Sequence, residues 1–142
     1  MDCPFCQIVQ NESERVLKDG PLTITILSNP RLIPGHVLVV PKRHIEKPWE
    51  MTAEERKEVF DTLFLFQEKL CTLFSTGCDI RENYRPFLPE GWTKVNHIHF
   101  HLNPREPEDA LFKESQIGER KLWQDLSEEE RVRFWEMLKE SN

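Results

Sequence analysis

The sequence lacks the features of several common protein classes. It has no apolar run approaching the roughly 18 residues of a membrane-spanning helix. Its opening, Met1-Asp2-Cys3-Pro4, has neither the basic start nor the apolar stretch of a secretion signal. It also has no excess of positive charge, because 19 Lys and Arg stand against 25 Asp and Glu for a net charge of -6. We therefore expect a cytoplasmic protein with no membrane partner and no broad basic surface for polymeric nucleic acid.

Disulfide bonds are not expected either. The four cysteines are Cys3, Cys6, Cys71 and Cys78. In a reducing compartment, a close pair of cysteines more often binds a metal or stays free than forms a bridge. Only Cys3 and Cys6 have the spacing of metal ligands, and they supply just half of a four-ligand zinc site.

The size and the local patterns indicate one α+β domain. The chain has 142 residues, of which 38% are hydrophobic, enough for one core and too few for two. The turn Asp19-Gly20-Pro21 lies between two β-prone runs and predicts a hairpin. Capping-box patterns predict helices that begin near Thr52 and Ser127. Further strands are expected at 36–40, 78–83 and 94–102, a long helix at 52–74, and a C-terminal helix after 127.

The strand expected at 94–102 carries three histidines at alternate positions. Residues two apart on a strand share a face, so His97, His99 and His101 are expected on one side. Ile98, Phe100 and Leu102 are expected on the other side, in the core. Three neighbouring imidazoles are compatible with a metal site, with a nucleophile flanked by anion-binding groups, or with a purely structural cluster. The strand alone does not decide among these three possibilities.

The segment from Asn96 to Arg105 resembles the His-x-His-x-His signature of the histidine-triad (HIT) family of nucleotide hydrolases and transferases. Three further segments resemble the same family in the same order, at Cys3 to Val9, Pro34 to Ile45 and Met51 to Glu55. The resemblance implies a HIT-like α+β fold, in which an antiparallel sheet packs on a long helix. We expect a HIT domain at 1–105, a helical extension at 106–142 packed on that domain, and a homodimer.

The resemblance also implies a covalent mechanism. His99, the middle histidine, is expected to attack the α-phosphorus of a nucleotide and to form a nucleotidyl-imidazole intermediate. His101 is expected to contact phosphate and to assist with charge and proton transfer, and His36 to line the same pocket. The expected substrate is a nucleoside phosphoramidate or a dinucleoside polyphosphate.

Some family members with this opening bind structural zinc. The resemblance implies that the zinc ligands are Cys3, Cys6, His44 and His97. This assignment removes His97 from catalysis and makes it a support for one end of the histidine strand.

The sequence departs from the family pattern at the substrate site. Ser28, followed by Asn29, stands where an acidic residue or asparagine commonly meets the ribose, and Trp92-Thr93-Lys94 replaces Gly-Gln-Ser/Thr. Asn83 is the candidate for the phosphate-side amide. The long loop region around Asn83 to His97 carries Arg81, Arg85 and Lys94, which predicts extra positive charge near the phosphates. The rival hypothesis is a regulatory module that binds nucleotides on this fold without turnover.

Overall fold

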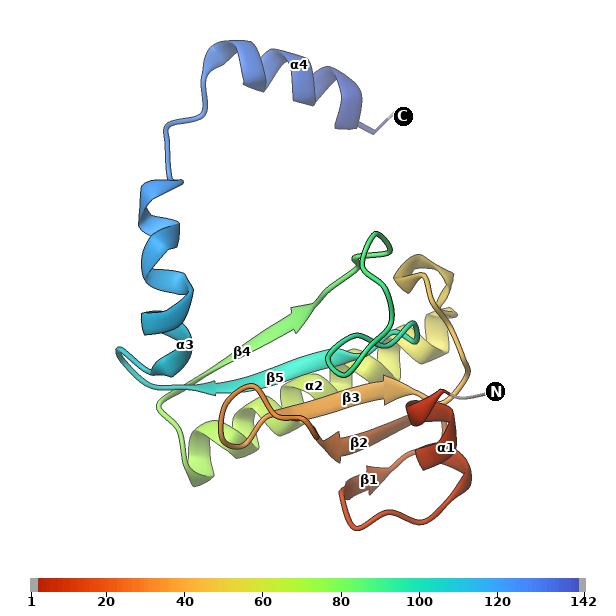
Figure 1. Ribbon diagram of the computed structural model, residues 1–142. Helices are drawn as coiled ribbons and strands as arrows, with labels where there is room; N and C mark the ends of the chain where they lie inside the picture. Colours follow the sequence, from red (N-terminus) through yellow and green to blue (C-terminus); the bar gives the residue numbers. More distant parts are fainter. Residues whose placement is uncertain (1–2, 141–142) are drawn as a thin grey trace. The chain divides into compact units, whose positions relative to one another are not determined.

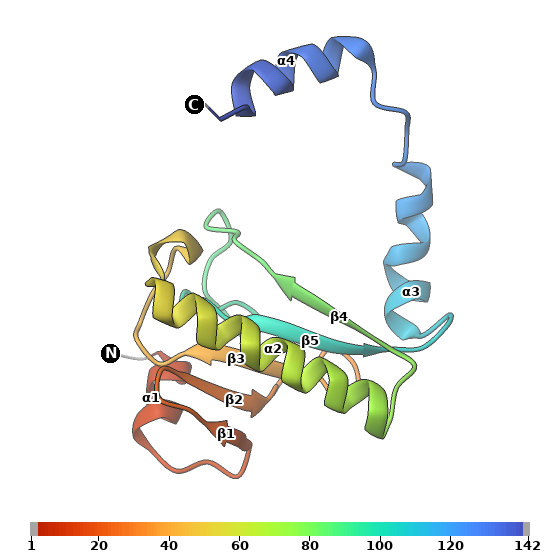
Figure 2. The same cartoon turned by 180° about the vertical axis from the view of Figure 1, so that it is seen from behind.

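The computed structural model describes residues 3–140, so Met1, Asp2, Ser141 and Asn142 lie outside the described residues. Five antiparallel strands form one sheet in the order β1-β2-β3-β5-β4, with a long helix across one face (Figures 1 and 2). The expected α+β fold, with an antiparallel sheet and a long helix, is therefore confirmed. The strands are β1 (Val16–Asp19), β2 (Thr23–Leu27), β3 (Val37–Pro41), β4 (Gly77–Glu82) and β5 (Phe100–Arg105).

Two faces of the sheet bury different apolar clusters. One face, with Val39, Phe100 and Leu102, packs against the long helix α2 (Ala53–Leu73). The opposite face, with Ile26 and Leu38, is covered by the short helix α1 (Pro4–Gln10), which sequence analysis had not predicted. Cys3 and Cys6 therefore lie against this second face of the sheet, which also carries every other residue of β5.

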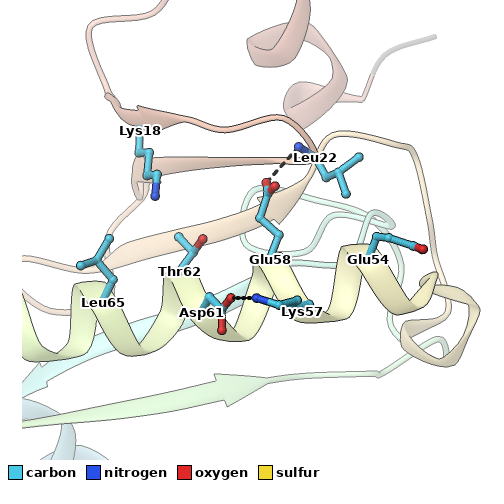
Figure 3. Close-up of a pocket in the computed structure, with 8 residues that line it drawn as sticks. All are labelled: Lys18, Leu22, Glu54, Lys57, Glu58, Asp61, Thr62 and Leu65. Atoms are coloured by element: carbon cyan, nitrogen blue, oxygen red, sulfur yellow. Dashed lines mark hydrogen bonds and ion pairs between the residues drawn. The ribbon is translucent and has the colours of Figure 1, made fainter.

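Helix α2 is fixed at its start and along its length. Thr52 and Glu55 form the predicted capping box, and the Glu55 carboxylate also accepts two hydrogen bonds from Arg43. Glu58 lies on the next turn, and its carboxylate accepts a hydrogen bond from the Leu22 N–H (Figure 3). It also accepts one from the Thr23 hydroxyl. These contacts tie the helix to the first hairpin.

The strand predicted at 94–102 is wrong in its bounds. The histidine strand, β5, begins only at Phe100 and runs on through Pro104 to Arg105. The β3–β5 register would place Ile98 opposite Pro41, which has no N–H to continue the ladder. The Ile98 N–H instead donates to the Ile45 carbonyl at 2.7 Å. Asn103, one residue beyond the predicted end of the strand, lies buried within β5.

The chain divides into two compact units, residues 1–109 and 110–142. The second unit contains α3 (Ala110–Glu114) and α4 (Glu128–Leu138), together with the 3-10 helix η2 (Gln116–Lys121). A further 3-10 helix, η1 (Pro48–Glu50), precedes α2 in the first unit. As predicted, Ser127 caps α4, since its hydroxyl accepts the Glu130 N–H. No helix within residues 3–140 is long and apolar enough to cross a membrane.

Candidate active site and metal site

Two groups of side chains with different chemistry meet at the start of β5. The first group joins the N-terminus to the segment after β3: Cys3, Cys6, His44 and His97 offer four ligand atoms that all lie within 4.8 Å of one another. The second group contains His36, His99 and His101. His97 therefore belongs to the first group and is separated from the other two triad histidines.

The four-residue cluster has the geometry of a tetrahedral metal site. Cys3 Sγ lies 3.4 Å from His97 Nδ1, and Cys6 Sγ lies 3.4 Å from His44 Nδ1 and 3.6 Å from His97 Nδ1. Zinc bonds of about 2.3 Å to sulfur and 2.0 Å to nitrogen would place those atoms about 3.5 Å apart. These three distances match zinc bond lengths, and a donor set of two cysteine sulfurs and two imidazoles is one that zinc commonly takes.

Neighbouring groups hold both histidines in the tautomer that a metal requires. His97 Nε2 lies 2.7 Å from the Pro41 carbonyl, which can only accept, so this nitrogen carries the proton. His44 Nε2 lies 3.2 Å from the Glu46 carboxylate and donates in the same way. Both Nδ1 atoms face the sulfurs, and in a neutral ring with its proton on Nε2 this is the nitrogen that binds a metal. Burial also lowers the pKa of His97 to about 4, which keeps its ring neutral.

His99 is arranged with one ring nitrogen anchored and the other free. Its Nδ1 donates to the backbone carbonyl of His97 at 2.7 Å. Burial is the main cause that lowers the pKa of His99, with the positive charge of Lys94 as a further cause. The ring is therefore neutral at physiological pH, and Nε2 presents an unprotonated lone pair. The Phe5 ring packs against His99 at a centroid distance of 4.9 Å and holds the imidazole in place.

His101 and His36 form a short hydrogen-bonded chain. The Leu32 N–H donates to His36 Nδ1 at 3.0 Å, which leaves the His36 proton on Nε2. His36 Nε2 then donates to His101 Nδ1 at 2.8 Å. Consequently, His101 carries its own proton on Nε2, from which it can donate to a substrate.

Burial keeps both rings of this chain uncharged. It lowers the pKa of His36 to about 4 and that of His101 to about 3. Neighbouring positive charge, including that of Arg81, is a second cause of these low pKa values, after burial. At neutral pH, His101 therefore supplies a hydrogen-bond donor rather than a positive charge.

The turn before β3 places His36. Gly35 has φ +82°, a left-handed conformation that favours glycine, and a Cβ there would lie 2.0 Å from the Phe74 ring. The glycine of the Pro-Gly-His segment is therefore required both by the backbone and by the close approach of the α2 C-terminus.

The remaining predicted substrate residues lie in two places. Asn83 and Lys94 line a cavity of about 230 Å³ together with His97 and His99. Ser28 and Asn29 are not among its lining residues; Asn29 is exposed, and the Ser28 hydroxyl donates to the Pro30 carbonyl. Two larger hollows lie away from the triad, one of which, between β1 and α2, is drawn in Figure 3.

Several groups that shape the site were not identified from the sequence. Phe5, Glu46 and the Pro41 carbonyl each orient a histidine, and Arg81 lies in β4 directly opposite His101 rather than in the loop. Glu46 could have been found, because a carboxylate two residues after a ligand histidine is a natural partner for its second nitrogen. The other contacts depend on chain segments far apart in the sequence.

Comparison with known proteins yields consistent matches. The model of the HIT domain family matches residues 9–108. An uncharacterised HIT-like protein of Methanocaldococcus jannaschii is 34% identical over 110 residues, which are 76% of this chain and 82% of that protein. An adenosine 5'-monophosphoramidase of Schizosaccharomyces pombe is 28% identical over 113 residues, 77% of this chain and 78% of that protein.

Solved structures show the same fold. A zinc-bound histidine triad family protein of Mycobacterium smegmatis superimposes with a TM-score of 0.64 at 26% identity. The match covers 78% of this chain and 80% of that protein.

Proposed function

Because this chain belongs to the HIT family, we propose that it is a nucleotidyl hydrolase or transferase in which His99 is the nucleophile. The family includes enzymes that act on nucleotides, as the similarity to an adenosine 5'-monophosphoramidase indicates. The observation that carries the proposal is the hydrogen bond from His99 Nδ1 to the His97 carbonyl, which leaves Nε2 unprotonated and free. A neutral imidazole in that tautomer is a competent nucleophile at phosphorus.

The proposed reaction proceeds in two displacements. In the first, a bond forms between His99 Nε2 and the α-phosphorus, while the bond from that phosphorus to the amine or phosphate leaving group breaks. The leaving group takes up a proton as it departs. In the second, water or another acceptor attacks the phosphorus and gives up its proton to His101 or to solvent, while the P–N bond breaks and His99 regains its lone pair. Two steps with an imidazole intermediate each have a lower barrier than one direct displacement.

The other residues of the site have supporting roles in this proposal. His101 Nε2–H donates to a phosphate oxygen or to the leaving group, and His36 holds His101 in the required tautomer. Asn83 and Lys94 lie beside His99 and contact the same phosphate. Ser28 and Asn29, in the loop before β3, contact the ribose. The substrate is a nucleoside phosphoramidate or a dinucleoside polyphosphate.

We also propose that the metal is a structural zinc ion. Four protein ligands fill a tetrahedral shell, which leaves no position for a catalytic water, so the ion would stabilise the fold and support the start of β5. Zinc binding requires both cysteines to be reduced, which agrees with the expected cytoplasmic location.

The active form is proposed to be a homodimer. β4 lies at one end of the sheet, and an edge strand can pair with another chain. On α2, Phe60 and Phe64 are 45% and 57% exposed, and their ring centroids lie 6.4 Å apart, so together they form an apolar patch that a partner chain can cover. Phe64→Glu should therefore yield a monomer in size-exclusion chromatography with light scattering. Leu17→Glu, on β1 at the opposite end of the sheet, is the matched control and should remain dimeric.

Activity measurements test the catalytic proposal. His99→Ala should lower kcat/KM for adenosine 5'-phosphoramidate by at least about 10³-fold, as expected for a covalent residue. The melting temperature, zinc content and AMP affinity should be close to those of the wild type. Near-normal turnover in this variant would contradict the assignment. A wild-type protein that binds AMP without turning over any nucleotide would instead favour a regulatory binding module.

A further inference from the structure

Arg81 is a cation next to His101, and the proposed function gives it no specific role. In the register between β4 and β5, Arg81 lies directly opposite His101, so the two side chains share one face of the sheet. Its Nε is buried and has no hydrogen-bond partner among residues 3–140. A buried guanidinium nitrogen without a partner is unfavourable and indicates a group that a ligand would satisfy.

Among residues 3–140, no carboxylate forms an ion pair with Arg81. Asp79, two residues earlier on the same strand, is engaged by Arg105 at 2.6 Å, and Arg105 is also bound by Asp109. The neighbouring histidines carry no charge of their own at neutral pH, as described above for His36 and His101. Arg81 is thus a positive charge close enough to the His36 and His101 rings to lower the pKa of both.

The position of Arg81 relative to the other binding groups gives the direction in which an anion would extend. β5 lies between β3 and β4 in the sheet. The loop with Ser28, proposed to contact the ribose, precedes β3 on one side, while Arg81 lies on β4 on the other side. A nucleotide with its α-phosphate at His99 would therefore direct the next group of its chain, away from the ribose, toward Arg81.

We propose that Arg81 binds a second phosphate of the substrate, the one linked to the α-phosphate on the side away from the ribose. The preferred substrate is accordingly a nucleotide with two or more linked phosphates rather than a monophosphate derivative. The planar guanidinium is suited to this role, because it can donate two parallel hydrogen bonds to phosphate oxygens. This inference rests on the proposed function only for the position of the first phosphate.

Equilibrium binding tests the inference without any need for turnover. Calorimetry would compare AMP with α,β-methylene-ADP, whose bridging carbon prevents cleavage at the α-phosphorus. The wild type should bind α,β-methylene-ADP about 10- to 100-fold more tightly than AMP, as expected for a charge-assisted contact. Arg81→Gln should reduce this ratio to about 1, while Arg81→Lys should keep part of it. Lys57→Gln, an equal change of charge at an exposed position on α2, should leave the ratio unchanged.

Two further arms sharpen the result. Adenosine 3',5'-bisphosphate, which carries its second phosphate on the ribose, should bind like AMP. The preference for α,β-methylene-ADP should also decrease as KCl is raised, because a partly exposed charge is screened over about 8 to 10 Å at ordinary ionic strength. A wild type that binds α,β-methylene-ADP no more tightly than AMP would overturn the inference. So would an Arg81→Gln variant that retains the preference for α,β-methylene-ADP, or one that binds both ligands more weakly by the same factor. So would a preference for the 3',5'-bisphosphate.

The proposed function and the role of Arg81 can fail separately. If the wild type turns over no nucleotide but shows the Arg81-dependent preference, the catalytic proposal fails and the Arg81 assignment stands. If the wild type is active and the ratio does not depend on Arg81, the assignment fails and the catalytic proposal stands.

Discussion

Acid should destabilise this protein through the buried histidine chain. His36 is 5% exposed, and burial lowers its pKa from 6.5 to about 4. Below pH 6.5 the unfolded chain therefore binds more protons at this residue than the folded chain does. The stability that depends on neutral His36 is fully present above about pH 6.5 and is lost as the pH falls toward 4.

The size of the effect follows from the two pKa values. At pH 5 the solution is 1.5 pH units below the pKa of 6.5 that His36 has in the unfolded chain. Each unit corresponds to about 1.36 kcal/mol, so His36 alone lowers the free energy of unfolding by about 2 kcal/mol. His101, with a pKa of about 3, acts in the same direction. A loss of this size is large compared with the roughly 5 to 15 kcal/mol that stabilises a typical domain.

Urea unfolding at pH 7.5 and pH 5, with excess zinc present, measures this effect. His36→Gln removes the titrating group and should be less stable than the wild type at pH 7.5. The difference in free energy of unfolding between the wild type and His36→Gln should be about 2 kcal/mol smaller at pH 5 than at pH 7.5. Loss of zinc in acid affects both proteins and largely cancels in the comparison. A difference that stays constant between the two pH values would refute the assignment of a neutral, buried His36.

Three other changes have defined outcomes. Cys3→Ser and Cys6→Ser should each abolish the stoichiometric zinc that elemental analysis finds in the wild type. Chelation of the wild type should lower its melting temperature more than its initial reaction rate. A metal-free wild type of ordinary stability would contradict the proposed zinc site. His101→Ala should lower kcat by about 10² to 10⁴-fold, less completely than His99→Ala, in steady-state assays with adenosine 5'-phosphoramidate. Glu55→Ala should lower the free energy of unfolding by about 1 to 2 kcal/mol in urea titrations, because it removes half of the capping box at the start of α2; a loss below about 0.5 kcal/mol would show that this cap contributes little.

Much of the fold was predictable because local patterns and tertiary packing agree. The hairpin around Gly20 and the helix capped by Thr52 were predicted close to their observed bounds, since turn and capping residues act on adjacent backbone groups. The histidine strand was misplaced, yet the alternation still predicted that Ile98, Phe100 and Leu102 enter the core. Hydrophobic alternation reports which side faces inward, whereas the length of a strand depends on whether its neighbour can pair.

The residues of the site were predictable where a family motif contains them. They were not predictable where the register between two strands determines which side chains lie together. The cluster of Cys3, Cys6, His44 and His97 was expected from the family resemblance, and the structure brings all four together. Arg81 falls within the strand predicted at 78–83 and was grouped with the cations of the following loop, but its position opposite His101 was not predicted, because it depends on how β4 pairs with β5. The tautomers of His99 and His101 likewise depend on backbone carbonyl and N–H groups that no sequence motif marks.

The most direct test of the central proposal is detection of the covalent intermediate at His99. Wild-type protein would be mixed with adenosine 5'-phosphoramidate, quenched within milliseconds to seconds, digested and analysed by mass spectrometry under conditions that preserve the P–N bond. The mechanism predicts one adenylyl group on the peptide that contains His99, localised to that residue, and no such group in His99→Ala. An adenylyl group on another residue, or rapid turnover by a His99→Ala variant, would contradict the proposal.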